Sequence, residues 1–353
     1  MSNSLLKFIK RKKDSNSYYI PNYFYFNSNQ KWARFLFDIK EDDVVIGELN
    51  WRQYKNKLII CCDKDTYNSS KLNTPNIDKY SNYLNIHDIN QQHIPIIKSN
   101  LQKCIRRSLI QKSIISAMTL FCLNKNDLLR RLPIIMLEDT CINYHFINVV
   151  WYMCASSKGY IINDKILSYI LGIIKYMASI NQQEIMNNEH IDIINIKQLL
   201  KQQNNLSEID KNLLLSLQLR KAYGGLQGDL KMLDYYTLKW YERLDNHLHD
   251  LDVNIELLEL ESIEYFSLNI IHPSAIDFHC TGILKQLMKK YNNIPEELLK
   301  NTIWHHRSKT NNKQITYGKD EYNNEYIDTW NTIKPYLHML SLNYISYKFD
   351  LFQ

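Results

Sequence analysis

Glycine and proline are scarce in this chain of 353 residues, which contains 8 Gly and 7 Pro. All-β, collagen-like and linker-rich proteins depend on these residues for their turns and extended segments, so those classes are excluded. Hydrophobic residues make up 45% and charged residues 23%, close to the globular average, which excludes wholesale disorder. The length suits one large domain or two ordinary ones.

Long apolar runs and paired cysteine motifs are also missing. No run reaches the roughly 18 residues of a membrane span, and the basic start at residues 7–13 lacks the apolar segment of a signal peptide. Seven cysteines, among them Cys61 and Cys62, show no C-x-x-C spacing, which is typical of reduced, buried thiols. We therefore expect an intracellular protein of the cytoplasm or nucleus, without a membrane partner.

Familiar catalytic motifs do not occur. The chain has no G-x-x-x-x-G-K-[ST] loop, and the nearest string, Gly318-Lys319-Asp320, has neither the spacing nor the hydroxyl. It has no G-x-S-x-G elbow and no H-E-x-x-H pair. P-loop hydrolysis of ATP is therefore not expected, and the sequence favours a non-enzymatic protein over an enzyme.

Composition also carries a bias that is not functional. The chain has 38 Asn, 33 Lys and 25 Tyr but only 10 Arg. Asn, Lys, Ile and Tyr share A/T-rich codons, so an A/T-rich genome accounts for much of this surplus. Arginine clusters are therefore more informative than lysine clusters here, and Arg is also the residue that binds phosphate bidentately.

The distribution of residues predicts a mainly α, α+β fold with a small N-terminal β portion. Aromatic and β-branched runs predict short strands at 18–20, 23–26, 33–39, 44–46 and 58–62. Polar residues 63–93 indicate a loop or linker. We expect three regions: a β-containing region with its linker at 1–93, a helical unit at 94–182, and a C-terminal helical region at 183–353, which opens on a Gln- and Asn-rich connector at 183–205.

Apolar residues at helical spacing predict the helices. Their expected ranges are 96–107, 111–123, 126–139, 143–157, 163–181, 206–222, 228–248, 275–291, 294–305 and 324–349. Ser207 with Asp210 resembles a capping box, and Gly159 is expected to end the 143–157 helix. Pro133 is expected to divide the 126–139 helix or to start its second half. Over 97–140 we expect three helices, with Cys104, Ile105, Ile115, Met118 and Ile135 buried.

Charge is segregated along the chain although the net charge is only +6. Residues 101–131 carry seven bases against Asp127, residues 242–264 carry eight acids against Arg243, and residues 285–320 carry eight bases and three acids. Basic segments of this kind either form a solvated face or contact phosphate.

The first basic segment has a helical pattern. Leu101, Cys104 and Ile105 form one apolar stripe, and three bases repeat that spacing two residues later. Two residues turn a helix by about 200°, so the basic stripe is expected on the face opposite the core. The predicted nucleic-acid-binding residues are Lys103, Arg106, Arg107, Arg130, Arg131, Trp304, Arg307 and Lys309.

Residues 97–140 resemble part of a known family. Lys103-Cys-Ile-Arg106-Arg107-Ser108 precedes a helix, and Asn126-Asp127 then leads to Arg130-Arg131-Leu and Glu138-Asp139. This order is similar to the helical collar of the clamp-loader-like AAA+ ATPases of the replication-associated recombination protein / Werner-helicase-interacting-protein family. The resemblance implies a collar-like oligomerisation unit without the motor, in a replication accessory protein. Glu138 and Asp139 are expected to neutralise Arg130 or Arg131, a structural role that we prefer to a catalytic one.

A glycine-rich loop separates two predicted helices. Gly224, Gly225 and Gly228 are three of the eight glycines, and Asp229 follows them as an expected N-cap or first-turn acid. A tight helix–helix turn explains this pattern. A phosphate loop is the alternative, but it lacks a lysine and a preceding strand.

A second candidate site gathers side chains that can bind metal. His272, Asp277, His279 and Cys280 could coordinate a divalent ion or take part in acid–base chemistry, if the segment is extended rather than helical. A buried, hydrogen-bonded turn is the alternative for this segment, and nucleic-acid contact through Trp304, Arg307 and Lys309 is another. No cofactor is otherwise expected.

These observations favour a non-catalytic, nucleic-acid-associated or replication accessory factor that forms homo-oligomers through the collar-like unit. A metal-dependent hydrolase or nuclease using the His272–Cys280 region with Asp229 is the alternative. A purely structural interaction protein is a third interpretation.

Overall fold

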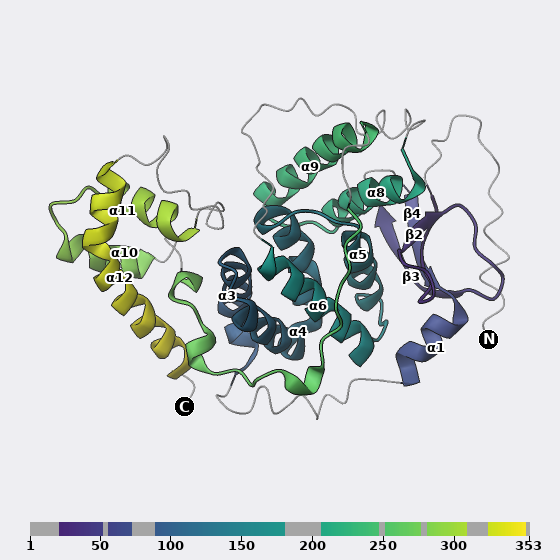
Figure 1. Cartoon of the computed structure of the whole chain (residues 1–353), viewed down its shortest axis with the longest axis horizontal. Coiled ribbons are helices and arrows are strands. Elements are labelled where there is room, and N and C mark those ends of the chain that lie inside the picture. Colours follow the sequence, from purple (N-terminus) through teal and green to yellow (C-terminus); the bar gives the residue numbers. More distant parts are fainter. Residues whose placement is uncertain are drawn as a thin grey trace.

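The computed structural model describes residues 21–51, 56–72, 89–180, 206–246, 251–276, 281–308 and 324–350. In these residues the chain is mainly helical, with one small sheet near the N-terminus (Figure 1). The predicted fold class is confirmed. None of the described helices is long and apolar enough to cross a bilayer.

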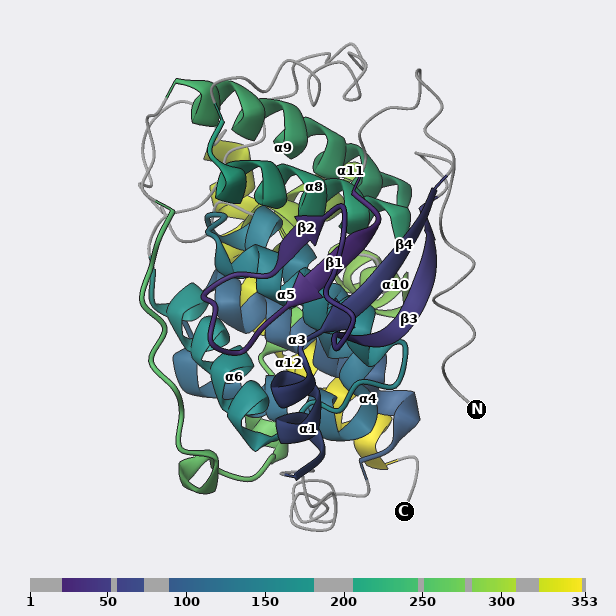
Figure 2. The same ribbon diagram turned by 90° about the vertical axis from the view of Figure 1, so that its right-hand side faces the viewer.

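Four strands form the sheet: β1 (Tyr23–Phe26), β2 (Arg34–Leu36), β3 (Val44–Trp51) and β4 (Asn56–Cys62). Their order is β2-β1-β4-β3, with β1 and β4 parallel and the outer pairs antiparallel. They match the predicted strands at 23–26, 33–39, 44–46 and 58–62, whereas residues 18–20 lie outside the described part. The sheet covers one face of the helices (Figure 2).

Helix α5 (His145–Ser156) anchors the sheet through Trp151. The Trp151 side chain is 0% exposed, and its Nε1–H donates to the carbonyl oxygen of Phe24 at 3.1 Å. Its ring centroid lies 4.9 Å from that of Phe26. An indole buried with its only donor satisfied is a strong anchor, so this contact fixes the sheet on the helical core.

Two asparagines protect the end of the sheet at β2. The amide of Ala33 donates to Asn148 of α5 at 2.8 Å, and the amide of Phe35 donates to Asn212 of α8 (Glu208–Ala222) at 2.9 Å. Unpaired edge amides would otherwise be open to pairing with another chain. The helices therefore close this edge with side chains.

Helix α1 (Lys64–Leu72) corrects the prediction of a loop or linker over 63–93. It is a polar helix without apolar periodicity, so the sequence pattern gave no sign of it. Asp63 explains its start, because its carboxylate accepts from the Thr66 amide at 2.9 Å and so satisfies one of the free amides of the first turn.

The central bundle contains α3 (Ile94–Arg106), α4 (Ile110–Asp139), α5 and α6 (Asp164–Ser179). Helix α4 bends at Asn124, whose φ of −161° and ψ of 94° are not helical, and the Asn124 side chain accepts from the Asp127 amide at 3.2 Å. Residues 97–140 therefore form three helical segments, as predicted. Pro133 lies inside the last segment and does not divide it, so that expectation is wrong.

The packing of this region is also as predicted. The five side chains expected to be buried are at most 1% exposed: Cys104, Ile105, Ile115, Met118 and Ile135. Buried residues from all three predicted regions belong to one continuous hydrophobic core. Helical spacing alone was sufficient to identify the core faces here.

Helices α8 and α9 (Gln227–Asp245) pack against each other beside the bundle. Ser207 caps α8 by accepting from the Asp210 amide, as predicted. At the other end of the chain, α10 (Thr281–Lys290), α11 (Glu296–Ile303), a π-helical turn at Trp304–Ser308 and α12 (Asn324–Asp350) lie away from the sheet (Figure 1). Helix α10 begins later than the predicted residue 275, where the chain forms a short 3-10 turn at Pro273–Ala275.

Residues 251–276 form an extended strap that joins the α8–α9 pair to these C-terminal helices (Figure 1). His145 holds its beginning: Nε2 donates to the carbonyl of Val253 at 2.8 Å, and Nδ1 accepts from the Tyr169 hydroxyl at 2.5 Å. Burial lowers the pKa of His145, so the imidazole stays neutral and keeps both roles.

The strap crosses α6 at Gly172. A Cβ at this position would lie 2.2 Å from the carbonyl oxygen of Glu256 and 2.8 Å from Cγ2 of Ile255. The missing side chain therefore allows the backbone of the strap to approach the helix.

We expect Gly172→Ala to lower the free energy of unfolding by about 1–3 kcal/mol, because the added methyl group forces the strap away from α6. In an exposed helix the same change would stabilise, since Ala has the higher helix propensity. Urea unfolding of both proteins measures the difference. An equal or higher stability of the variant would contradict this packing.

Candidate functional site

The predicted basic stripe of α3 is not exposed, and this expectation is wrong. Arg106 is 1% exposed and Lys103 7%. The strap covers the second face of α3, where Asn100 donates to the carbonyl of Ile270 at 3.2 Å and Ser99 donates to that of Ala275 at 2.7 Å. A helix covered on both sides has no solvent-facing stripe, and the sequence could not show that the strap returns to this place.

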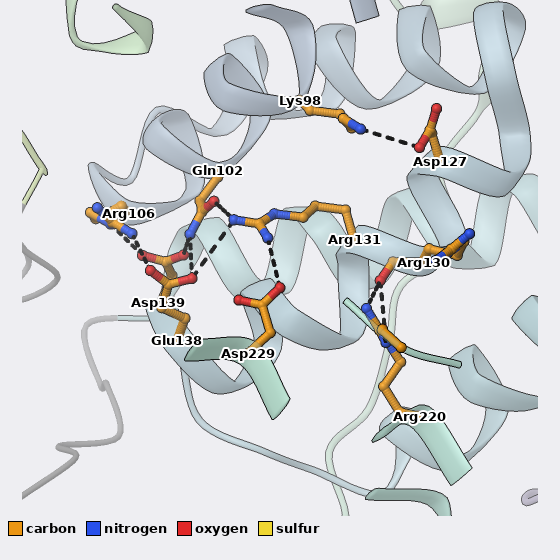
Figure 3. A network of polar contacts seen from close by, with 11 residues as sticks. Lys98, Gln102, Arg106, Asp127, Arg130, Arg131, Glu138, Asp139, Arg220 and Asp229 are labelled. Atoms are coloured by element: carbon orange, nitrogen blue, oxygen red, sulfur yellow. Dashed lines mark hydrogen bonds and ion pairs between the residues drawn. The ribbon is translucent and has the colours of Figure 1, made fainter. Parts of the chain in front are cut away.

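Arg106 instead enters a buried network with two carboxylates of α4 (Figure 3). Its Nε forms a short hydrogen bond with Asp139, which is 0% exposed, and its Nη2 lies 3.2 Å from Glu138. Gln102 donates to both carboxylates, at 2.8 Å and 2.7 Å. Burial raises the pKa of Glu138, as does the charge of Asp139, while Arg106 and Arg131 oppose that rise.

Arg131 is the other base in this network. It lies 3.8 Å from Glu138 and 3.5 Å from Asp229, and it donates to the side-chain oxygen of Gln102. The prediction that Glu138 and Asp139 neutralise Arg130 or Arg131 is therefore confirmed for the Arg131–Glu138 pair. The principal partner of the two carboxylates is Arg106, which was expected on an exposed basic stripe instead.

Arg130 lies apart from these carboxylates, at the turn between α8 and α9. Its side chain is exposed and donates to the carbonyl of Tyr223 at 3.5 Å, while its own carbonyl accepts two bonds from Arg220, at 3.2 Å and 2.9 Å (Figure 3). Burial and the charges of Arg130 and Arg131 lower the pKa of Arg220 to about 10. Arg220 was missed, and its position four residues before Gly224, whose carbonyl it also binds, was the available signal.

The glycine-rich loop is a helix–helix turn, the simpler of its two predicted explanations. Gly224 and Gly225 have φ angles of 75° and 151°, which side-chain-bearing residues rarely adopt. Gly228 and Asp229 lie in the first turn of α9, where an acid is favourable. Leu226 at the tip of the turn is 72% exposed.

Five basic side chains gather where α3 and α4 meet the strap and the C-terminal helices, and we name them the junction cluster: Arg107, Lys112, His272, Arg307 and His338. Arg107 donates to the carbonyl of Arg307 at 2.6 Å, and Lys112 donates to that of Asn269 at 2.5 Å. Among the described residues, no carboxylate forms a salt bridge with Arg107 or Lys112. These two donors therefore bind neutral oxygens.

His272 lies at the centre of the cluster. Its Nδ1 accepts from the amide of Ser274 at 3.1 Å and lies 2.6 Å from the Ser274 hydroxyl, and its own amide donates to Asn100 at 2.8 Å. Burial, followed by the charges of Arg107, Arg307, Lys112 and His338, lowers the pKa of His272 to about 4. A neutral imidazole here is surrounded by positive charge.

The remaining predicted residues are those of the Trp304–Lys309 segment and the candidate metal ligands. Trp304 begins the π-helical turn and is 41% exposed, and Arg307 in the same turn is 5% exposed. Lys309 lies outside the described residues, as do three of the four predicted metal ligands: Asp277, His279 and Cys280. No group of three metal-capable side chains occurs in the part of the chain that the structure describes.

Five of the eight predicted nucleic-acid-binding residues thus lie in three places. Arg106 and Arg131 are in the carboxylate network, Arg130 is at the glycine turn, and Arg107 and Arg307 meet in the junction cluster. Comparisons of the chain with protein-family models, with curated proteins and with solved structures find no match.

The junction cluster predicts acid sensitivity. His272 has a pKa of about 4 in the folded state against an ordinary 6.5, so between these pH values only the unfolded chain binds the proton. The contribution of His272 to the free energy of unfolding is therefore complete above pH 6.5 and is lost as the pH falls towards 4. The loss is at most about 3 kcal/mol before solvent screening is considered.

Replacing His272→Gln is expected to reduce this loss. Urea unfolding at pH 7 and pH 5 measures the loss in both proteins, and His306, whose pKa is also lowered to about 4, contributes equally to each. The same loss in wild type and variant would show that His272 is not the responsible group.

Proposed function

We propose that the protein is a non-catalytic, nucleic-acid-associated accessory factor that binds backbone phosphate at the junction cluster. The observation that carries this proposal is the gathering of Arg107, Lys112, His272, Arg307 and His338 from separate segments, with Arg107 and Lys112 bound to backbone oxygens rather than to carboxylates. The positive charges of Arg107, Lys112 and Arg307 surround the neutral imidazole of His272 and repel one another in the free protein. A bound phosphate removes that repulsion, so the arrangement favours an anionic ligand.

The surroundings of the cluster suit a nucleic acid better than a small anion. Lys112 is partly exposed and His338 exposed, so phosphates of an extended chain can reach them. Trp304, three residues before Arg307, is 41% exposed, and an exposed indole offers a face for base stacking. The net charge of +6 favours association with polyanions in general.

The resemblance of residues 97–140 to a replication-associated collar supports the same proposal, and it adds a homo-oligomer and replication proteins as partners. The alternative is a metal-dependent hydrolase, whose candidate ligands Asp277, His279 and Cys280 lie outside the described residues. Metal analysis of the purified protein separates the two, because a stoichiometric ion that survives dialysis supports the hydrolase.

Binding of labelled duplex DNA and of single-stranded RNA over a series of salt concentrations tests the proposal. We expect binding at low salt that weakens linearly on a log–log plot, with a slope of about −0.9 for each neutralised phosphate of duplex DNA and about −0.7 for a single strand. The nucleic acid that binds more tightly at the same salt identifies the preferred class. No binding of either at low salt would refute the proposal.

A further inference from the structure

Trp304 is the one tryptophan that the fold leaves exposed. The chain has six tryptophans, and the structure describes all of them. Trp304 is 41% exposed, whereas the other five are buried or half-buried. Tryptophan is enriched in binding interfaces because its ring gives a large contact area at a small cost in conformational entropy.

Neighbouring rings restrain this indole. Trp304 begins the π-helical turn, and its ring centroid lies 5.2 Å from that of His305, with the two ring planes at 76°. The His305 ring in turn lies 4.9 Å from that of Tyr326, in the first turn of α12. A side chain that is already restrained loses less conformational entropy when a ligand stacks on it. Short π-helical turns are rare and are frequently found at functional sites.

The same turn supplies Arg307 of the junction cluster. The carbonyl of Arg307 accepts from Arg107 of α3 at 2.6 Å, and its Nη1 donates to the Ser341 hydroxyl of α12 at 2.9 Å. These two bonds fix the turn at the cluster. A phosphate-binding group and an exposed aromatic ring therefore lie on one turn of five residues.

Single-stranded nucleic acid combines the two chemical features that this turn can bind. Its phosphates alternate with bases whose faces are open to stacking on an aromatic side chain. In a duplex the bases are paired and stacked on one another, so a side chain reaches a base face only by separating a base step. A free phosphate ion has no ring to stack.

We propose that the junction cluster and Trp304 together bind single-stranded nucleic acid, with phosphates at the cluster and a base stacked on the indole. This inference rests on the proposed phosphate binding at the cluster and narrows its ligand to single strands. Duplex DNA binds through the cluster alone, and therefore more weakly.

Fluorescence anisotropy with three labelled chains that carry the same number of phosphates tests this proposal. They are oligothymidylate, an abasic chain without bases, and a hairpin duplex. At equal salt we expect the wild-type protein to bind oligothymidylate more tightly than either of the others. Oligouridylate is titrated beside oligothymidylate, and the tighter of the two identifies RNA or DNA as the preferred strand.

Trp304→Ala should weaken the binding of oligothymidylate about 5- to 150-fold, which corresponds to the loss of one stacked base. It should leave the affinity for the abasic chain and for the duplex unchanged, and the salt slope as well, because no charge is removed. Phe37→Ala is the matched control, since Phe37 is 44% exposed and follows β2, away from the C-terminal helices. It should change none of these affinities.

Tryptophan fluorescence gives a second readout. Oligothymidylate should quench the emission of the wild-type protein, whereas Trp304→Phe should keep most of the affinity and lose this quenching. Circular dichroism confirms the fold of each variant, and the comparison with the abasic chain needs the wild-type protein alone.

Equal wild-type affinities for oligothymidylate and the abasic chain would overturn the inference, as would an unchanged single-strand affinity of a folded Trp304→Ala variant. Salt-dependent binding of all three chains would then still support phosphate binding at the junction cluster. If none of the chains binds at low salt, the phosphate site itself is wrong, so the two failures are distinguishable.

Discussion

Arg106→Met is expected to lower the free energy of unfolding by about 3–5 kcal/mol, because it leaves a buried carboxylate without its partner. Asp139 is 0% exposed and loses the short bond from Arg106, so that only Gln102 remains to stabilise its charge among the contacts seen here. The methionine fills a similar volume, which limits the contribution from a cavity. Urea unfolding at pH 7 gives the difference directly.

Two controls separate the lost charge pair from general damage. Arg131→Met removes a half-buried base from the same network and should cost less, because Arg131 is 26% exposed and its carboxylates lie 3.5 Å or more away. The double variant Arg106→Met with Asp139→Asn should recover much of the loss, since no buried charge then remains unpaired. If the double variant is as unstable as Arg106→Met, repulsion of an unpaired charge is not the cause.

The second large effect concerns nucleic-acid affinity. Replacing Arg107→Ala together with Lys112→Ala removes two bases of the junction cluster, each of which we expect to neutralise one phosphate. At 0.1 M salt two lost contacts correspond to a roughly 50- to 100-fold weaker affinity, and the difference should nearly vanish towards 1 M salt. All sequences should be affected about equally, because phosphate contacts position a nucleic acid without specifying its bases.

Fluorescence anisotropy with two duplexes of unrelated sequence measures this change. Unfolding of the double variant is measured beside it, since Arg107 also binds the carbonyl of Arg307. A loss of affinity confined to one sequence would indicate base recognition instead of phosphate binding.

Helical periodicity predicted most of the fold because the long helices bury one regular face. The burial of Ile115, Met118 and Ile135, for example, follows from spacing alone. Helix α1 was missed since its sequence is polar throughout and its start depends on the single cap at Asp63. The length of strand β3, which runs beyond the predicted residue 46 to Trp51, depends on its pairing with β4.

The candidate site was only partly predictable. Four of the five cluster members were noticed as bases or as a histidine in the sequence, but the sequence grouped Arg107 with Lys103 and Arg106, which are both buried, and Arg106 pairs with the carboxylates of α4. Arg107 and Arg307 are 200 residues apart and meet only because the strap returns to α3. A return of this kind depends on tertiary contacts and leaves no local pattern.

The salt dependence of DNA binding by the Arg107→Ala, Lys112→Ala variant tests the phosphate site most directly. Lys158→Ala with Lys231→Ala is the matched control, because it removes the same number of charges from exposed positions outside the cluster. The proposal predicts that the log–log slope becomes shallower by about two units in the cluster variant and stays unchanged in the control. Equal slopes in wild type, cluster variant and control would contradict phosphate binding at the junction cluster.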